Sequence, residues 1–90
     1  MKIKIPGSFQ LAGVTWKVVE VPGLEDLGLC HRDKQLIELN AEATVVTKEI
    51  ALIHEIVHAI LFTMGEDDHD EVSTDALAHM WHQVLTTMKK

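Results

Sequence analysis

The chain contains the stretch KEIALIHEIVHAILFTMG over residues 48–65, and this stretch decides how the second half folds. It has no proline, and its one glycine is Gly65, which stands where a glycine commonly ends a helix. Thr44 and Thr47 are the candidates for the residue that caps the start. Apolar residues recur at spacings of three and four, which predicts a helix over 48–64. These residues are Ile50, Ile53, Val57, Ile60, Leu61 and Met64.

A second helix is predicted over 71–88, after the acidic connection EDDHD at 66–70. Its apolar residues again follow helical spacing, so we expect two packed helices, with Trp81 in the core. The apolar stripe of this helix consists of Val72, Ala76, Leu77, Met80, Trp81, Val84, Leu85 and Met88.

The first forty residues predict strands, because runs rich in β-branched residues are bounded by Pro-Gly turn signals. Along 14–21 the side chains alternate between two faces, which places Trp16 in the core together with Val18. The predicted strands cover 2–5, 14–21, 28–32 and 35–39, and residues 8–11 either continue the first strand or begin the next arm.

The segments 28–32 and 35–39 predict a β-hairpin, in which Ile37 and Leu39 share the more apolar face, the one expected to face the core. A sheet followed by helices is typical of the α+β class. The sequence therefore predicts a small, mainly antiparallel sheet followed by two packed helices, in a single domain over 1–90.

Composition and charge limit the possible functions. Residues 1–40 carry five basic and five acidic side chains and residues 41–90 carry three basic and nine acidic ones, so the net charge of −6 lies in the second half. This balance offers no basic patch for nucleic-acid phosphates. No apolar run reaches the ~20 residues that span a membrane. A single cysteine, Cys30, and an N-terminus without a signal-peptide core predict a cytoplasmic protein.

The motif HEIVH at 54–58 lies in the middle of the first predicted helix. Residues four positions apart project from the same helix face, so His54 and His58 can bind one Zn²⁺ together. Glu55 lies about 100° around the helix axis from His54, where it can act as a general base toward a zinc-activated water. The alternative is that both histidines are surface residues. Apolar neighbours such as Ala59 argue against this alternative, because they leave no polar, solvent-facing stripe on the helix.

A catalytic zinc takes three protein ligands and keeps one position for water, so a third ligand must come from elsewhere in the chain. We expect Glu71 to be this ligand, with Asp75 and His69 as alternatives. In the preferred arrangement, Asp75 accepts a hydrogen bond from a ligating histidine. The competing interpretation is that Glu71, Asp75 and His82 form a solvated helix face. His79 and His82 are candidates for polarising a substrate carbonyl, or else they are surface residues.

Three segments resemble a known family. The hairpin GLCHRDKQLIELNA at 28–41, the motif HEIVHA at 54–59 and the helix start EVSTDALAH at 71–79 are similar to the compact zincin core of ImmA/IrrE-like metallopeptidases of phages and mobile elements. The resemblance covers about residues 28–85. It implies a zincin-like core with the motif on the first helix, and a cytoplasmic zinc endopeptidase that in some members cleaves a repressor encoded beside it.

The function expected from the sequence is therefore a zinc metallopeptidase, with Glu55 as general base and a protein or peptide as substrate. The alternative is a zinc-stabilised module that binds a protein without cleaving it, and a third possibility is a purely structural zinc site. The presence of Glu55 argues against the third, because a structural site has no use for a base. Neither nucleic acid nor membrane is expected as a partner.

The hairpin arm 35–39 shortly precedes the motif helix, and we expect it to form the sheet edge beside the metal. An edge strand has unpaired backbone groups with which an extended peptide can pair. The alternative is a central strand that is already paired on both sides.

Overall fold

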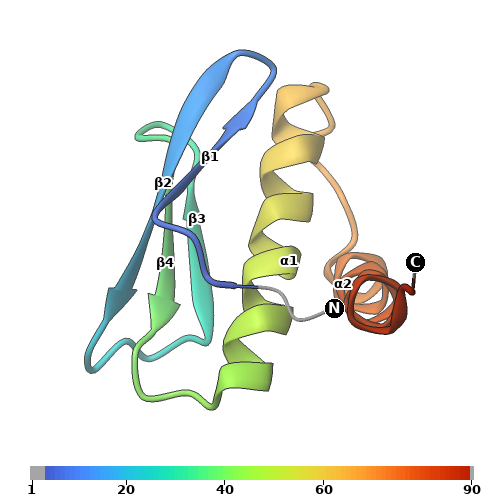
Figure 1. Cartoon of the computed structure of the whole chain (residues 1–90). Helices are drawn as coiled ribbons and strands as arrows, with labels where there is room; N and C mark the ends of the chain where they lie inside the picture. Colours follow the sequence, from blue (N-terminus) through green and yellow to red (C-terminus); the bar gives the residue numbers. More distant parts are fainter. Residues whose placement is uncertain (1–3, 90) are drawn as a thin grey trace.

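The computed structural model describes residues 4–89, and in that part the chain forms four strands and two helices (Figure 1). The strands are β1 (Ser8–Leu11), β2 (Val14–Val21), β3 (Gly28–His31) and β4 (Leu36–Asn40). The helices are α1 (Val45–Thr63) and α2 (Glu71–Thr87). The predicted α+β class is confirmed. Within residues 4–89, neither helix has the length and hydrophobicity needed to cross a membrane.

The sheet is mixed and has the strand order β1-β2-β4-β3. β1 pairs antiparallel with β2, and β3 pairs antiparallel with β4, which confirms the predicted hairpin. β2 and β4 pair in parallel, from Lys17 opposite Leu36 to Val21 opposite Asn40. The sheet is therefore mainly antiparallel, with one parallel pairing that the sequence pattern did not indicate.

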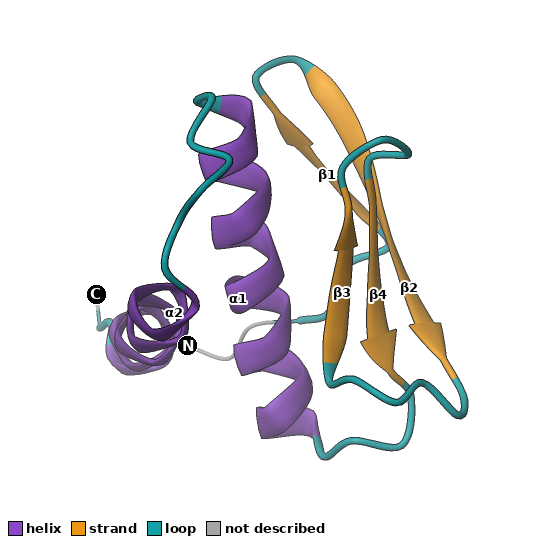
Figure 2. Ribbon diagram, turned by 180° about the vertical axis from the view of Figure 1, so that it is seen from behind, coloured by secondary structure: helices purple, strands orange, loops and turns teal. Residues whose placement is uncertain are grey.

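The prediction that the arm 35–39 forms the sheet edge is wrong, because β4 lies between β2 and β3. Ile37 and Leu39 of β4 are both 0% exposed, as residues of a central strand commonly are. The edge strand beside α1 is β3, the other arm of the same hairpin (Figure 2). Alternation along an arm indicates which face is buried, and it carries no information on how many strands flank that arm.

Residues 8–11 form a strand of their own rather than continuing an earlier one, and this strand, β1, pairs with β2. Of the predicted strand over 2–5, residues 2 and 3 lie outside the described part, and residues 4 and 5 are not in a strand. Phe9 of β1 stacks on Trp16 of β2, with ring centroids 6.2 Å apart. This contact closes one end of the core.

α1 lies between the sheet and α2, as Figures 1 and 2 both show. Thr44 caps its start by accepting a hydrogen bond from the backbone N–H of Thr47, and Gly65 follows its end with φ 84°, a left-handed conformation that glycine adopts readily. Thr44 is one of the two predicted caps, so α1 begins at Val45, ahead of the predicted 48–64, and Gly65 follows its end as predicted. Because α1 is covered on two sides, apolar side chains are buried around much of its circumference. The core consists of Trp16, Val18, Ile37, Leu39, Ala51, Leu52 and Ala59.

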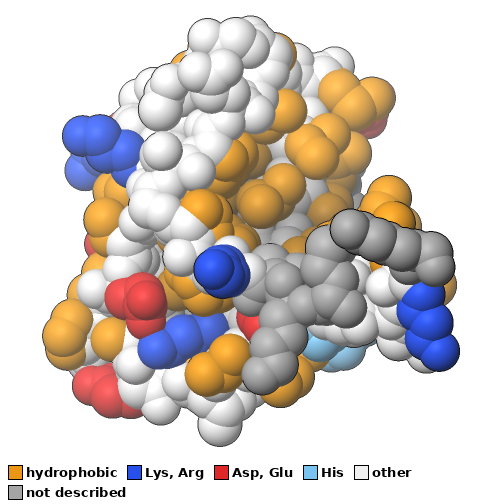
Figure 3. All heavy atoms as spheres, viewed as in Figure 1, with side chains coloured by type: hydrophobic (Ala, Val, Ile, Leu, Met, Phe, Trp, Pro, Cys, Tyr) orange, Lys and Arg blue, Asp and Glu red, His pale blue; other side chains and the backbone are white. Residues whose placement is uncertain are grey.

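α2 packs on α1 through small residues and not through its apolar stripe. Thr74 and Ala78 are the buried residues of α2. Trp81 is 51% exposed, so the prediction that it lies in the core is wrong, whereas Trp16 is 4% exposed as predicted. The sheet lies on the far side of α1 and cannot reach the stripe (Figure 1). Figure 3 shows more hydrophobic side chains at the surface, over the C-terminal half of α1.

Candidate metal centre

His54 and His58 project from the same face of α1, as their spacing predicts. Their ring centroids are 4.9 Å apart. Both side chains are largely buried, with 17% of His54 and 12% of His58 exposed. The interpretation of the two residues as surface histidines is therefore wrong, because each ring is covered by the fold and has polar partners.

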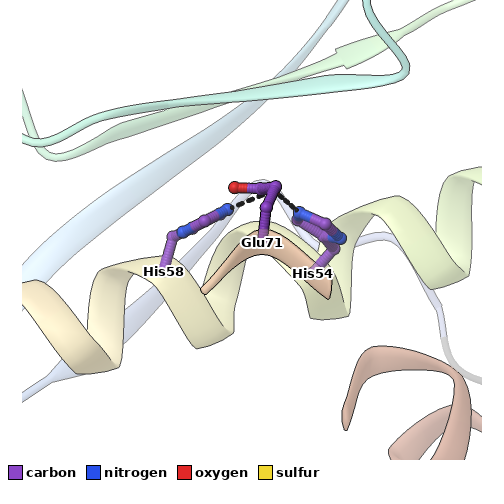
Figure 4. A group of neighbouring side chains, drawn as sticks. All are labelled: His54, His58 and Glu71. Carbon is purple, nitrogen blue, oxygen red and sulfur yellow. Dashed lines mark hydrogen bonds and ion pairs between the residues drawn. The ribbon is translucent and has the colours of Figure 1, made fainter. Parts of the chain in front are cut away.

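Glu71, the first residue of α2, brings a carboxylate oxygen between the two rings (Figure 4). Its Oε1 lies 2.6 Å from Nε2 of His54 and 3.0 Å from Nε2 of His58. Partial burial alone would raise the pKa of Glu71, but hydrogen bonds from the two histidines outweigh it and hold this pKa below its ordinary value. The three residues expected as ligands thus lie together.

The donor set fits Zn²⁺, because two imidazole nitrogens and one carboxylate oxygen are ligands found in catalytic zinc sites. Ligand atoms about 2 Å from one tetrahedral ion lie roughly 3.3 Å from one another. The three donor atoms here all lie within 4.8 Å of one another, and the group could hold a metal ion. Three donors of this kind leave a coordination position for water.

Two further residues contact the outer nitrogens of the histidine rings. Asp75, one turn after Glu71 on α2, has Oδ1 at 3.3 Å from Nδ1 of His54. His69, in the connection between the helices, has Nε2 at 2.5 Å from Nδ1 of His58. Neither residue belongs to the three-donor group, so the geometry favours Glu71 over both alternatives as the third ligand.

α2 is held by a cap at its start and by a largely buried hydrogen bond to α1 further along the helix. The Asp70 side chain accepts hydrogen bonds from the backbone N–H groups of Val72 and Ser73. Glu49 of α1 is 4% exposed, and its Oε1 lies 2.8 Å from Nε2 of His82 on α2. These contacts turn the polar side of α2 toward α1 and set Glu71 over the histidines. The interpretation of this side as a solvated face is therefore wrong for His82.

Glu55 lies on the sheet side of the same helix and is 8% exposed. Burial raises the pKa of its carboxyl group to about 7, while the neighbouring His54 lowers this pKa and the carboxylate of Glu71 raises it. Burial, and then the charge of Glu55, also raise the pKa of the Cys30 thiol to about 12, so this thiol stays protonated at neutral pH. Burial therefore disfavours the charged form of Glu55.

A cavity of about 540 Å³ opens beside the three donors. One wall is the start of β3 and the residues before it, and the other wall is formed by α1 and the start of α2. His79 lines this cavity, whereas His82 does not. Of the two candidates for polarising a carbonyl, the structure brings only His79 to the site. The cavity is lined by Asp26, Leu27, Gly28, Thr47, Ile50, Ala51, His54, Glu55, Glu71, Asp75 and His79.

Gly28 is a residue of the site that the sequence did not indicate. A Cβ at this position would lie 3.0 Å from Cγ of Glu55 and 3.2 Å from its Oε2. A side chain at this position would therefore push the Glu55 side chain away by a few tenths of an ångström. A glycine at the start of a predicted strand is the one available signal, and it is equally typical of a turn.

Comparisons with protein-family models, with curated proteins and with solved structures gave no match. The similarity to ImmA/IrrE-like metallopeptidases therefore stays a prediction from the sequence. The functional conclusion depends on the geometry of the site.

Proposed function

We propose that the protein is a zinc-dependent metallopeptidase with a zincin-like core, in which His54, His58 and Glu71 hold the metal. The observation that carries this proposal is the position of Glu55. The Glu55 side chain is 8% exposed, lines the same cavity as His54 and Glu71, and has no hydrogen bond or ion pair with any residue in the described range 4–89. A site that only stabilises the fold has no use for such a group.

When bound, Zn²⁺ supplies a Lewis acid that polarises a peptide carbonyl and activates a water molecule. Glu55 would accept a proton from this water and pass it to the nitrogen of the leaving amine. A carboxyl group with a pKa near neutrality suits both steps, because it is a stronger base than an ordinary carboxylate and can still release the proton. Asp75 would hold His54 by accepting a hydrogen bond from Nδ1.

The edge of β3 offers a place for an extended peptide beside Glu55. The backbone N–H of Asn40 donates to the carbonyl oxygen of Leu27, 3.0 Å away. In an antiparallel pair, hydrogen-bonded residues alternate with residues whose backbone groups point outward, so those of Gly28 and Cys30 point away from β4. A peptide paired there would run along the cavity wall. The edge strand β3 therefore replaces the arm 35–39 as the proposed docking strand.

The proposed substrate is a flexible segment of a protein. Pairing through the backbone involves few side-chain contacts, so many substrate sequences are tolerated. It also requires a segment that can adopt an extended conformation. The resemblance adds a repressor-type regulator as a substrate and the cytoplasm as the location, and both belong to the proposal.

The second candidate function is a zinc-stabilised module that binds a partner protein without cleaving it. The exposed apolar stripe of α2 favours this alternative, because Met80 is 57% and Trp81 51% exposed. Large apolar side chains gathered at a surface are typical of interaction sites.

The substitution Glu55→Gln separates the two functions. The amide keeps the size of the side chain but cannot accept the proton, so we expect zinc content and fold to be retained and hydrolysis of labelled casein to fall about 10²–10⁴-fold. Glu49→Gln is the matched control, since it lies on the same helix, is equally buried and keeps an acceptor for His82. Equal cleavage by wild type and Glu55→Gln would refute the peptidase mechanism, and a zinc-loaded wild type without activity would favour the binding module.

A further inference from the structure

His69 contacts the metal centre from the side that Glu71 does not occupy. Its Nε2 lies 2.5 Å from Nδ1 of His58, whose other nitrogen, Nε2, faces Oε1 of Glu71 at 3.0 Å. The second nitrogen of His69, Nδ1, lies 2.6 Å from the backbone carbonyl oxygen of Glu66. A line of two hydrogen bonds therefore runs from the connection between the helices to Nδ1 of His58, and the opposite nitrogen of the same ring, Nε2, faces the metal position.

When a metal is bound between His54, His58 and Glu71, the chemistry of these groups sets the direction of each hydrogen bond. A carbonyl oxygen only accepts, so Nδ1 of His69 must carry a proton. Nε2 of a neutral His69 then has the lone pair, and it accepts the proton on Nδ1 of His58. With its proton on Nδ1, His58 would offer its lone pair on Nε2 to a bound metal, in place of the hydrogen bond that this nitrogen donates to Glu71 in the metal-free chain.

We propose that His69 is a positioning residue that holds His58 in the tautomer and ring orientation required to bind the metal. This inference rests on the metal centre of the proposed function and is independent of peptide hydrolysis. His69 does for His58 what Asp75 does for His54, since each partner accepts a hydrogen bond from Nδ1. Partners of this kind orient metal ligands and increase their basicity.

The connection 64–70 is braced against the fold at the point where it presents His69. The His69 ring packs edge-on against Phe62, with ring centroids 5.2 Å apart. The guanidinium carbon of Arg32 lies 5.2 Å from the same Phe62 ring, and Nη1 of Arg32 lies 2.8 Å from Oδ1 of Asp67. The position of His69, and with it the metal affinity, therefore depends on the conformation of this connection.

The test compares the Zn²⁺ affinity of three proteins, measured by competition with a chromophoric chelator. His69→Phe keeps a ring against Phe62 but removes the acceptor, whereas His69→Gln places a carbonyl oxygen at about the reach of the histidine Nε2. We expect His69→Phe to weaken Zn²⁺ binding about 10–100-fold and His69→Gln to stay within about threefold of wild type. His31→Phe is the matched control, because His31 is half-buried on the sheet, is paired with Glu38, and should leave the affinity unchanged.

A second measurement detects the tautomer directly. Long-range ¹H–¹⁵N correlation NMR of the zinc-loaded wild type should show His69 with its proton on Nδ1 and none on Nε2. A His69 that donated to His58 instead of accepting from it would carry a proton on Nε2.

Four results would overturn the proposal. Equal Zn²⁺ affinity in wild type and His69→Phe overturns it, and so does a proton on Nε2 of His69. If His69→Phe and His69→Gln both lower the Zn²⁺ affinity far more than 100-fold while Glu71→Gln leaves it unchanged, His69 is a metal ligand and not a positioning residue, which also overturns the proposal. A wild type that binds no Zn²⁺ overturns the metal centre and this inference together. Weaker binding by His69→Phe in a protein that cleaves no peptide supports the inference and counts against the proposed hydrolysis alone.

Discussion

Glu55 should make the stability of the metal-free protein depend on pH. Burial raises the pKa of its carboxyl group from 4.5 to about 7 in the folded chain. Because the folded state holds this proton more tightly than the unfolded state, the group favours folding at low pH. The stability that it contributes is fully present below pH 4.5 and is lost as the pH rises through about 7. Glu55→Gln, which cannot ionise, should remove this dependence.

The magnitude follows from the size of the shift. Each pKa unit corresponds to about 1.4 kcal/mol of differential interaction between the two protonation states. Between pH 5 and pH 8, wild type should therefore lose about 2–3 kcal/mol more unfolding free energy than Glu55→Gln. A small domain has a total stability of only about 5–15 kcal/mol, so this loss is measurable.

The assay is urea unfolding of EDTA-treated protein at pH 5 and at pH 8, with wild type and Glu55→Gln measured side by side. The two proteins differ only at residue 55, so the comparison isolates the charge of Glu55 together with its interactions with His54 and Glu71. If the unfolding free energies of wild type and Glu55→Gln depend on pH in the same way, the conclusion that burial raises the pKa of the Glu55 carboxyl group is refuted.

Four further substitutions test other parts of the structure. Trp16→Ala should cost about 3–5 kcal/mol in urea unfolding and Trp81→Ala less than about 1 kcal/mol, and equal losses would contradict their burial. Gly28→Ala adds a Cβ 3.0 Å from Cγ of Glu55, so it should lower casein hydrolysis about tenfold or more at unchanged zinc content, and full activity would refute the close approach. Glu49→Ala leaves its histidine partner on α2 without an acceptor and should cost about 2–3 kcal/mol, so an unchanged melting temperature would show that the buried pair does not hold α2.

The sequence predicted those features that are set by local geometry. The helix around the HEIVH motif follows from apolar spacing, and Thr44 and Gly65 mark its ends by their backbone chemistry. Because one helical turn separates His54 from His58, their approach follows from the helix alone. The alternation along β2 and β4 likewise predicted which of their faces is buried.

Features that depend on pairing between distant segments could not be predicted in this way. The parallel pairing of β2 with β4 joins strands that are separated by β3 in the chain, and no local pattern indicates it. The packed face of α2 is set by the small residues Thr74 and Ala78 and by the pair of Glu49 with His82. Hydrophobicity alone pointed instead to the stripe around Trp81.

The sequence predicted which three residues of the candidate site lie together, and only partly what surrounds them. Glu71 stood out because an acidic residue opens the second helix, and Asp75 follows one turn later. His69 was considered only as a ligand, because its contact with Nδ1 of His58 depends on the path of the connection between the helices. Gly28 gave no signal beyond that of a turn glycine.

The most direct test of the metal centre is the number of zinc ions bound per chain. Wild type and His58→Ala are loaded with Zn²⁺, dialysed and measured by elemental analysis together with protein concentration. Because His54, His58 and Glu71 provide all three donors, we expect about one zinc ion per wild-type chain and almost none in His58→Ala. Full zinc occupancy in His58→Ala would contradict the account.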